Sequence, residues 1–163
     1  MDFLFWLESF GPAAWVRESN SLWAFPMFLF VHTLGVSLVA GGSAIIAFAL
    51  LGVWPKAPIK PLERLYPLIW FGFVINLFTG LGLFSADAAT RGINPDFYAK
   101  LVLVFGGVYV MARIKRQVFQ SAEIERGQIP AGAKTLAWVS LVCWFGAIVT
   151  GRLIAYVGPI AGL

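Results

Sequence analysis

The chain has 163 residues, of which 60% are hydrophobic and 12% are charged, about half the charged fraction of a soluble domain. This composition excludes an ordinary soluble domain and predicts an integral membrane protein. The net charge of +4 comes from basic residues in short connections beside apolar segments, a pattern that reports orientation in a membrane and not contact with nucleic acid.

The N-terminal stretch MDFLFWLESFGPAAWVRES is rich in aromatic side chains but is too short and too polar to cross a bilayer. Gly11 and Pro12 interrupt it, so residues 3–16 are predicted to form an interfacial helix followed by a turn at the membrane surface. Asp2 and Glu8 stand where a signal peptide would carry basic residues, which argues against a cleaved leader.

Four apolar segments follow, and each is long enough to cross a hydrocarbon core about 30 Å thick, which takes roughly 20 helical residues. Residues 19–21 offer N-cap oxygens at the start of the first segment, and Pro67 suits the first turn of the second. The sequence therefore predicts an all-α fold: a four-helix transmembrane bundle with a short N-terminal interfacial helix, in one membrane domain over residues 1–163. The predicted spans are residues 22–53, 66–86, 97–119 and 133–157.

The distribution of Lys and Arg over the connections predicts the orientation, because the side richer in these residues faces the cytoplasm. The first and third connections are therefore expected in the cytoplasm, and both termini on the opposite, outer side. The basic residues of the cytoplasmic side are Lys56, Lys60, Arg64, Arg113, Lys115, Arg116, Arg126 and Lys134, and those of the outer side are Arg17, Arg91, Lys100 and Arg152.

His32 is the only histidine, and it lies in a stretch from Ser19 to Pro55 without an Asp, Glu, Lys or Arg. It stands about ten residues from the outer start of the first span, which at 1.5 Å per residue places it roughly 15 Å into the membrane. Asp87, Lys100 and Arg152 belong to the same outer half. The sequence thus predicts that polar side chains gather in the outer half of the bundle and that the inner half is nearly inert.

Two interpretations of His32 are open from the residues alone. A lone intramembrane histidine can be structural, hydrogen-bonding two helices together. It can also be the axial ligand of a haem iron, since a neutral imidazole is a good ligand for that metal; the cofactor would then be haem b.

The haem hypothesis gives each neighbouring residue a role. Gly35 and Gly42 share a helix face with His32 and would give the ring clearance. Asn76 or Thr79 would hold the other imidazole nitrogen and fix its tautomer. The haem propionates would pair with Arg152, assisted by Lys100 or Arg91.

A single histidine per chain excludes bis-histidine ligation within one copy. The haem hypothesis therefore predicts a homo-oligomer that shares a site, a five-coordinate iron, or Met or Cys as the second ligand. Two other functions are open: a scaffold or auxiliary subunit of a larger membrane complex, and conduction of protons or small solutes between subunits. In each case the bilayer is a partner, and the chain is not expected to be an enzyme by itself.

The motifs FPMFLFVHTLG, GFVINLFTGLGLFSADA, NPDFYAKLVLV and SLVCWFGAIVTGRLIAY occur in this order. They resemble a bacterial family of four-helix inner-membrane proteins known as a domain of unknown function, and more remotely the copper-resistance-D and cytochrome b561 membrane proteins. The resemblance covers about residues 22–157 and implies a multi-pass inner-membrane protein; with the basic residues cytoplasmic, both termini are expected in the periplasm.

The family pattern matches this chain at positions in each span, but the resemblance brings no established activity. One departure lies at the end of the first span, where the family has an Asp-Leu-Arg-Leu-Leu-Gly run and residues 47–52 read AFALLG. Both charges are missing, so a role that depends on them is not expected here. The matching positions are His32, Gly35, Thr79, Gly80, Lys100, Gly151 and Arg152.

Overall fold

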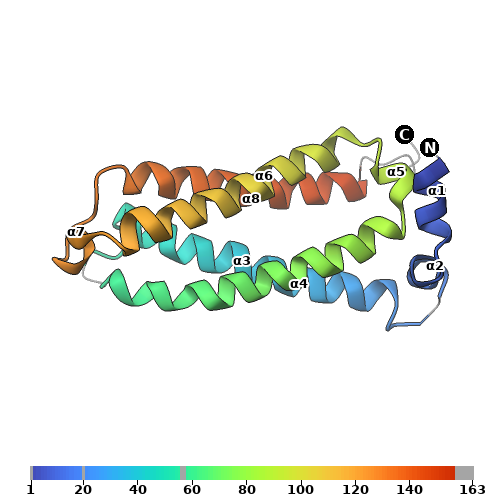
Figure 1. Ribbon diagram of the computed structural model, residues 1–163, viewed down its shortest axis with the longest axis horizontal. Helices are drawn as coiled ribbons and strands as arrows, with labels where there is room; N and C mark the ends of the chain where they lie inside the picture. The colour runs from blue at the N-terminus through green and yellow to red at the C-terminus, as the bar shows by residue number, and fades with distance from the viewer. Residues whose placement is uncertain (1, 20, 56–57, 157–163) are drawn as a thin grey trace.

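A computed structural model of the protein describes residues 2–19, 21–55 and 58–156, and every regular element in these ranges is a helix (Figure 1). Four of the helical segments are long and apolar enough to cross a membrane, which confirms the predicted all-α fold and its four spans. The elements are α1 (Asp2–Ser9), α2 (Gly11–Glu18), α3 (Phe25–Leu51), η1 (Lys60–Leu65), α4 (Tyr66–Ser85), α5 (Ala88–Arg91), α6 (Pro95–Ile114), η2 (Lys115–Phe119), α7 (Ala122–Glu125) and α8 (Ala133–Tyr156).

The start of the first span differs from the prediction. α3 begins at Phe25, with Ala24 at the N-cap position and no side chain capping it, so the predicted N-cap at residues 19–21 is wrong. Pro26 lies in the first turn of the helix, where a proline is well tolerated because the first N–H groups have no partner within the helix. The proline therefore sets the start of the span.

The third span is one α-helix that changes into a π-helical turn, η2. It begins at Pro95, two residues before the predicted start at residue 97, and the Asn94 side chain caps it by accepting a hydrogen bond from the backbone N–H of Asp96 at 2.8 Å. The predicted fourth span ends at Val157, which lies outside the described residues.

The N-terminal segment forms two helices, α1 and α2, and not one helix and a turn. Pro12 lies in the first turn of α2 and starts a new helix there. Both helices cross the end of the bundle at which α5 connects α4 to α6 (Figure 1). We call this end the α5 end and the opposite one the α7 end. The large side chains that α1 and α2 expose are Phe3, Phe5, Trp6, Phe10 and Trp15.

The apolar core fills the middle of the bundle and its α7 end. α3 packs along α4 and α8, and α6 packs along α8. Ala47 and Ala49 are buried in α3. The fully buried side chains that form this core include Ile46, Leu50, Tyr66, Ile114, Phe119 and Ala137.

Two side-chain hydrogen bonds hold neighbouring elements together at the α7 end, one between the first and third connections and one between α4 and α6. Lys60 Nζ donates to the backbone oxygen of Phe119 at 2.7 Å, and Tyr66 Oη donates to that of Met111 at 3.0 Å. The basic connections therefore lie at one end of the bundle, as the predicted topology requires.

Candidate functional site

The polar residues of the α5 half begin with a hydrogen bond between α3 and α4. His32 Nδ1 lies 3.0 Å from Thr79 Oγ1, and the Thr79 hydroxyl donates its own hydrogen to the backbone oxygen of Ile75 at 2.7 Å. Since a hydroxyl has only one hydrogen, Thr79 accepts here and His32 Nδ1 carries the proton. The neutral imidazole then has a lone pair on Nε2. Of the two residues predicted to orient the imidazole, Thr79 contacts it through its side chain, and the backbone of Asn76 also lies within hydrogen-bonding range of the ring.

Gly80 lets the His32 imidazole lie directly against α4. A Cβ atom at this position would stand 3.3 Å from His32 Cε1 and 3.8 Å from Nδ1, closer than most side-chain carbons approach. The sequence-based list of site residues missed this contact. The adjacent Thr79-Gly80 pair could have predicted the contact, because a hydrogen-bonding side chain next to a glycine can hold a ring and leave room for it.

Asn76 presents a buried acceptor one turn away from Thr79. Its Oδ1 atom is shielded from solvent and has no hydrogen-bond donor among the described residues. An amide oxygen without a donor in a low-dielectric interior is costly. Asn76 is therefore a candidate to accept a hydrogen bond from a ligand or an ordered water molecule.

Lys100 reaches into the bundle from α6. Its Cε and Nζ atoms lie 3.6 and 3.7 Å from the place that a Cβ atom of Gly151 would take, so the stem rests on α8. Its ammonium group and the guanidinium of Arg91 are within electrostatic range of the His32 imidazole. Lys100 is partly buried, and no carboxylate among the described residues is within ion-pair distance of it.

The structure does not bring Arg152 into this group. Gly151 faces the Lys100 side chain, whereas Arg152, the next residue on α8, is exposed. Successive residues of a helix point in directions about 100° apart, so the two positions cannot face the same neighbour. Of the predicted cationic partners, Lys100 and Arg91 therefore lie near His32.

Gly35 and Gly42 contact α4 and leave no space for a ring. A Cβ atom at Gly35 would stand 3.0 Å from the backbone oxygen of Gly72, and one at Gly42 would stand 2.7 Å from Ile69 Cγ1. Small residues at such positions allow two helices in a membrane to approach closely. The predicted ring clearance at these two glycines is therefore wrong, because helix packing takes up the space.

The polar group ends where the apolar core begins. A cavity of about 10 Å³ lies among the four long helices α3, α4, α6 and α8, and apolar and aromatic side chains surround it. The residues around it include Val39, Ile69, Phe73, Val108, Met111 and Trp144. The ionisable side chains within the bundle thus lie in the α5 half, whereas the buried polar groups toward the α7 end are hydroxyls, those of Ser43, Tyr66 and Ser140.

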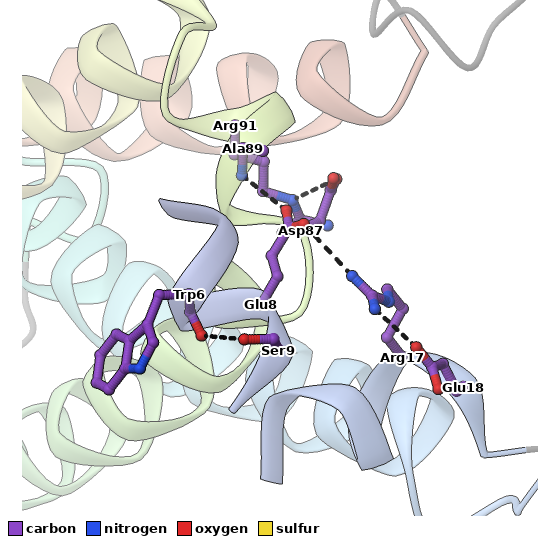
Figure 2. A network of polar contacts seen from close by, with 8 residues as sticks. All are labelled: Trp6, Glu8, Ser9, Arg17, Glu18, Asp87, Ala89 and Arg91. Atoms are coloured by element: carbon purple, nitrogen blue, oxygen red, sulfur yellow. Dashed lines mark hydrogen bonds and ion pairs between the residues drawn. The ribbon is translucent and has the colours of Figure 1, made fainter. Parts of the chain in front are cut away.

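An ion-pair network fastens the N-terminal helices beside the site (Figure 2). Glu8 Oε1 accepts from the backbone N–H of Ala89 at 2.7 Å and thereby caps α5 from a distant part of the chain. Arg17 contacts Glu8 at 3.4 Å and Glu18 at 2.7 Å. The hydrogen bond to Glu18, followed by the charges of the acidic neighbours, raises the pKa of Arg17. This network could not be predicted from the sequence, because Glu8 and Ala89 are far apart along the chain.

Asp87, at the N-cap position of α5, pairs at 3.2 Å with Arg91, the last residue of that helix (Figure 2). Within the described residues, no three His, Cys, Asp or Glu side chains come together as in a metal site built from protein ligands alone. A haem iron needs no such cluster, since the porphyrin supplies four of its ligands.

Comparison of the chain with protein-family models, with curated proteins and with solved structures gave no match.

Proposed function

We propose that this chain is a small haem-binding membrane subunit that takes part in electron transfer. The haem would be of the b type and would lie in the α5 half of the bundle, with Nε2 of His32 as axial ligand. The haem iron would supply the redox chemistry when bound. The chain itself would bind and orient the cofactor and keep it apart from water.

The observation that supports this proposal best is the orientation of the imidazole. Thr79 Oγ1 accepts a hydrogen bond from the Nδ1–H group of His32. Proteins use such a bond to fix the tautomer of a metal-binding histidine and to make its other ring nitrogen a stronger ligand. A purely structural histidine would make the same bond to Thr79, so the bond alone does not separate the two roles. The buried Asn76 acceptor and the Lys100 ammonium group, which lie in the same half of the bundle, have no role in a purely structural link, whereas a bound ligand would use both.

The cationic side chains fit a ligand that carries carboxylates. An ammonium group within a membrane span is rare unless it is paired or faces a polar interior. Lys100 and Arg91 both lie within electrostatic range of His32; Lys100 would neutralise a propionate, and Arg91, which already pairs with Asp87, would assist. Arg152 is exposed and is left out of the proposed site.

The position of His32 bears on the second axial ligand. His32 contacts Thr79 and Gly80 of its own chain, and the next residues on that face, Gly35 and Val39, are buried in the bundle. This arrangement favours a five-coordinate iron over a haem shared between two copies. A homo-oligomer or a larger membrane complex then serves the transfer of electrons to a partner and not the ligation itself.

The visible spectrum of the protein purified from haem-replete cells tests the proposal. We expect a Soret band that the His32→Ala variant loses while the protein stays folded. Thr79→Val should broaden or shift the band, because the tautomer is no longer fixed, and Thr79→Ser should restore it. Thr33→Val is the matched control: this threonine is exposed on α3, one residue from His32, and its hydroxyl donates to the backbone oxygen of Leu29 in its own helix.

A colourless preparation that stays colourless when haem is added would contradict the proposal. So would a Soret band that survives in His32→Ala. In either case the bond between His32 and Thr79 would be a structural link between α3 and α4.

A further inference from the structure

Two short helices meet at the α7 end, where α4 begins and α6 ends (Figure 1). The helix η1 directly precedes α4, η2 directly follows α6, and the two contact each other. Lys60 of η1 donates to the backbone oxygen of Phe119 in η2 at 2.7 Å. Lys115 of η2 lies with its Nζ atom 5.5 Å from the centre of the Tyr66 ring, a distance at which the face of the ring attracts a cation. These contacts bring basic residues of the first and third connections together.

The two short helices carry an excess of positive charge. We call their four basic side chains the cationic junction; they are Lys60, Arg64, Lys115 and Arg116. Glu63 is the one carboxylate of η1 and η2, so the net charge of these two elements is +3. Glu63 pairs with Lys60 at 3.3 Å. Among the described residues, no carboxylate lies within ion-pair distance of the other three cations.

Arg64 and Arg116 are available for a ligand, because both side chains are exposed. The helix α7 contacts η2 and carries two carboxylates, but within the described residues neither forms an ion pair with the junction. At the α5 end, by contrast, Arg17 and Arg91 each have a carboxylate partner. The charge of the cationic junction is therefore not balanced by the parts of the chain that contact it.

Exposed aromatic side chains mark the membrane boundary beside the junction. Trp70 lies four residues from the start of α4, Tyr109 five residues from the end of α6 and Trp138 five residues from the start of α8, and all three are exposed. At 1.5 Å per residue they lie roughly 6–8 Å from the helix ends. Trp and Tyr concentrate at the headgroup level of a bilayer, so the cationic junction lies at the level of the lipid phosphates.

We infer that the cationic junction binds the headgroup of an anionic phospholipid. The guanidinium groups of Arg64 and Arg116 suit this ligand, because their parallel N–H donors match two oxygens of a phosphate group. Clusters of Lys and Arg beside a membrane span attract anionic lipids. The acyl chains would lie along α4, where Leu68 and Phe71 are exposed. The position at headgroup level favours a lipid over an acidic protein, and the inference does not depend on bound haem.

Native mass spectrometry of the full chain, released from detergent micelles, tests the inference, because it resolves each bound lipid and yields its dissociation constant. The probes are phosphatidylglycerol, which is anionic, and phosphatidylcholine, which is not, with the same acyl chains. We expect the first phosphatidylglycerol to bind about tenfold or more tightly than the first phosphatidylcholine, which corresponds to roughly 1.4 kcal/mol. Equal affinity for the two lipids would overturn the inference.

Substitution of the two exposed arginines tests the position of the site. Arg64→Gln and Arg116→Gln should each weaken the binding of phosphatidylglycerol about fivefold, the effect of roughly 1 kcal/mol for each cation near an anionic lipid. Thermal unfolding checks that both variants stay folded. Lys134→Gln is the matched control, since it removes one positive charge from the same end but lines an open hollow beside the start of α8. An equal loss in all three variants would indicate diffuse attraction and would overturn the inference.

Glycerol phosphate separates a lipid headgroup from a soluble phosphate compound as the occupant. It offers similar phosphate chemistry without acyl chains. Added at the same concentration as the lipid, it should leave the binding of phosphatidylglycerol unchanged. Displacement of the lipid under these conditions would overturn the assignment of the junction to a lipid.

Discussion

His32 and Thr79 join α3 to α4 through a hydrogen bond of 3.0 Å in which the threonine accepts, because its own hydrogen goes to the backbone of Ile75. The bond fixes which imidazole nitrogen carries the proton. It also determines what the site can do, since Nε2 has the lone pair with which a histidine binds a metal.

The contact of Gly42 with α4 predicts a large difference between two neighbouring glycines. Gly42→Ala would place a methyl group 2.7 Å from Ile69 Cγ1, and overpacking of this kind costs about 1–3 kcal/mol. Gly41→Ala is the control, because nothing lies within 4 Å of the new methyl group. We expect thermal unfolding in mild detergent to shift downward for Gly42→Ala alone. Equal stability of the two variants would show that α3 and α4 are not packed this closely.

The buried hydroxyl of Tyr66 predicts a smaller effect at the α7 end. Tyr66→Phe removes its bond to the Met111 backbone oxygen but keeps the ring against Phe119, so we expect a loss of about 0.5–1.5 kcal/mol. Tyr109→Phe, at an exposed position on α6, should change the free energy of unfolding less. Denaturant titration of both variants measures the difference, and the reverse order of stability would contradict the described junction.

Much of the fold could be predicted from the sequence, because the four spans depend on local properties. Length, apolar composition and prolines near the helix starts are visible in any short window, and the positions of α4, α6 and α8 follow from them. The start of α3 was misplaced by the polar residues 19–21, whose side chains do not cap it, whereas Pro26 lies in its first turn.

The candidate site was predictable only in part. That His32, Asn76, Thr79 and Lys100 share one half of the bundle follows from depth alone. Which of them touch depends on how the helices rotate about their axes, and the sequence gives no direct measure of that rotation. For this reason the glycines of α3 were assigned to a ring when they contact α4, and Arg152 was grouped with Lys100 although only Lys100 faces inward.

Glu8 predicts a local change at the α5 end. Glu8→Gln weakens the cap on the Ala89 N–H, and loss of such a cap costs about 0.5–2 kcal/mol. We expect faster amide exchange in α1 and α5 with little change in the four long helices. Glu18→Gln is the control, since Glu18 pairs with Arg17 but does not cap α5. Equal exchange in both variants would mean that the network in Figure 2 does not hold the N-terminal helices.

The proposed inner-membrane orientation predicts the labelling of exposed positions. A cysteine introduced at Glu123, in the third connection, should react with a membrane-impermeant maleimide only after the cells are opened. A cysteine at Trp23, which is exposed near the start of α3, should react in cells whose outer membrane alone is permeabilised. Both experiments use the Cys143→Ser background, and the opposite pattern would reverse the topology.

Chemical rescue of the axial ligand tests the central claim most directly. His32→Gly removes the imidazole and leaves a space beside Gly80 that free imidazole can enter. We predict that purified His32→Gly loses the Soret band and regains it when imidazole is added together with haem, whereas addition of haem alone has no effect. A haem spectrum in His32→Gly identical to that of the wild type, with or without imidazole, would contradict the claim that His32 binds the iron.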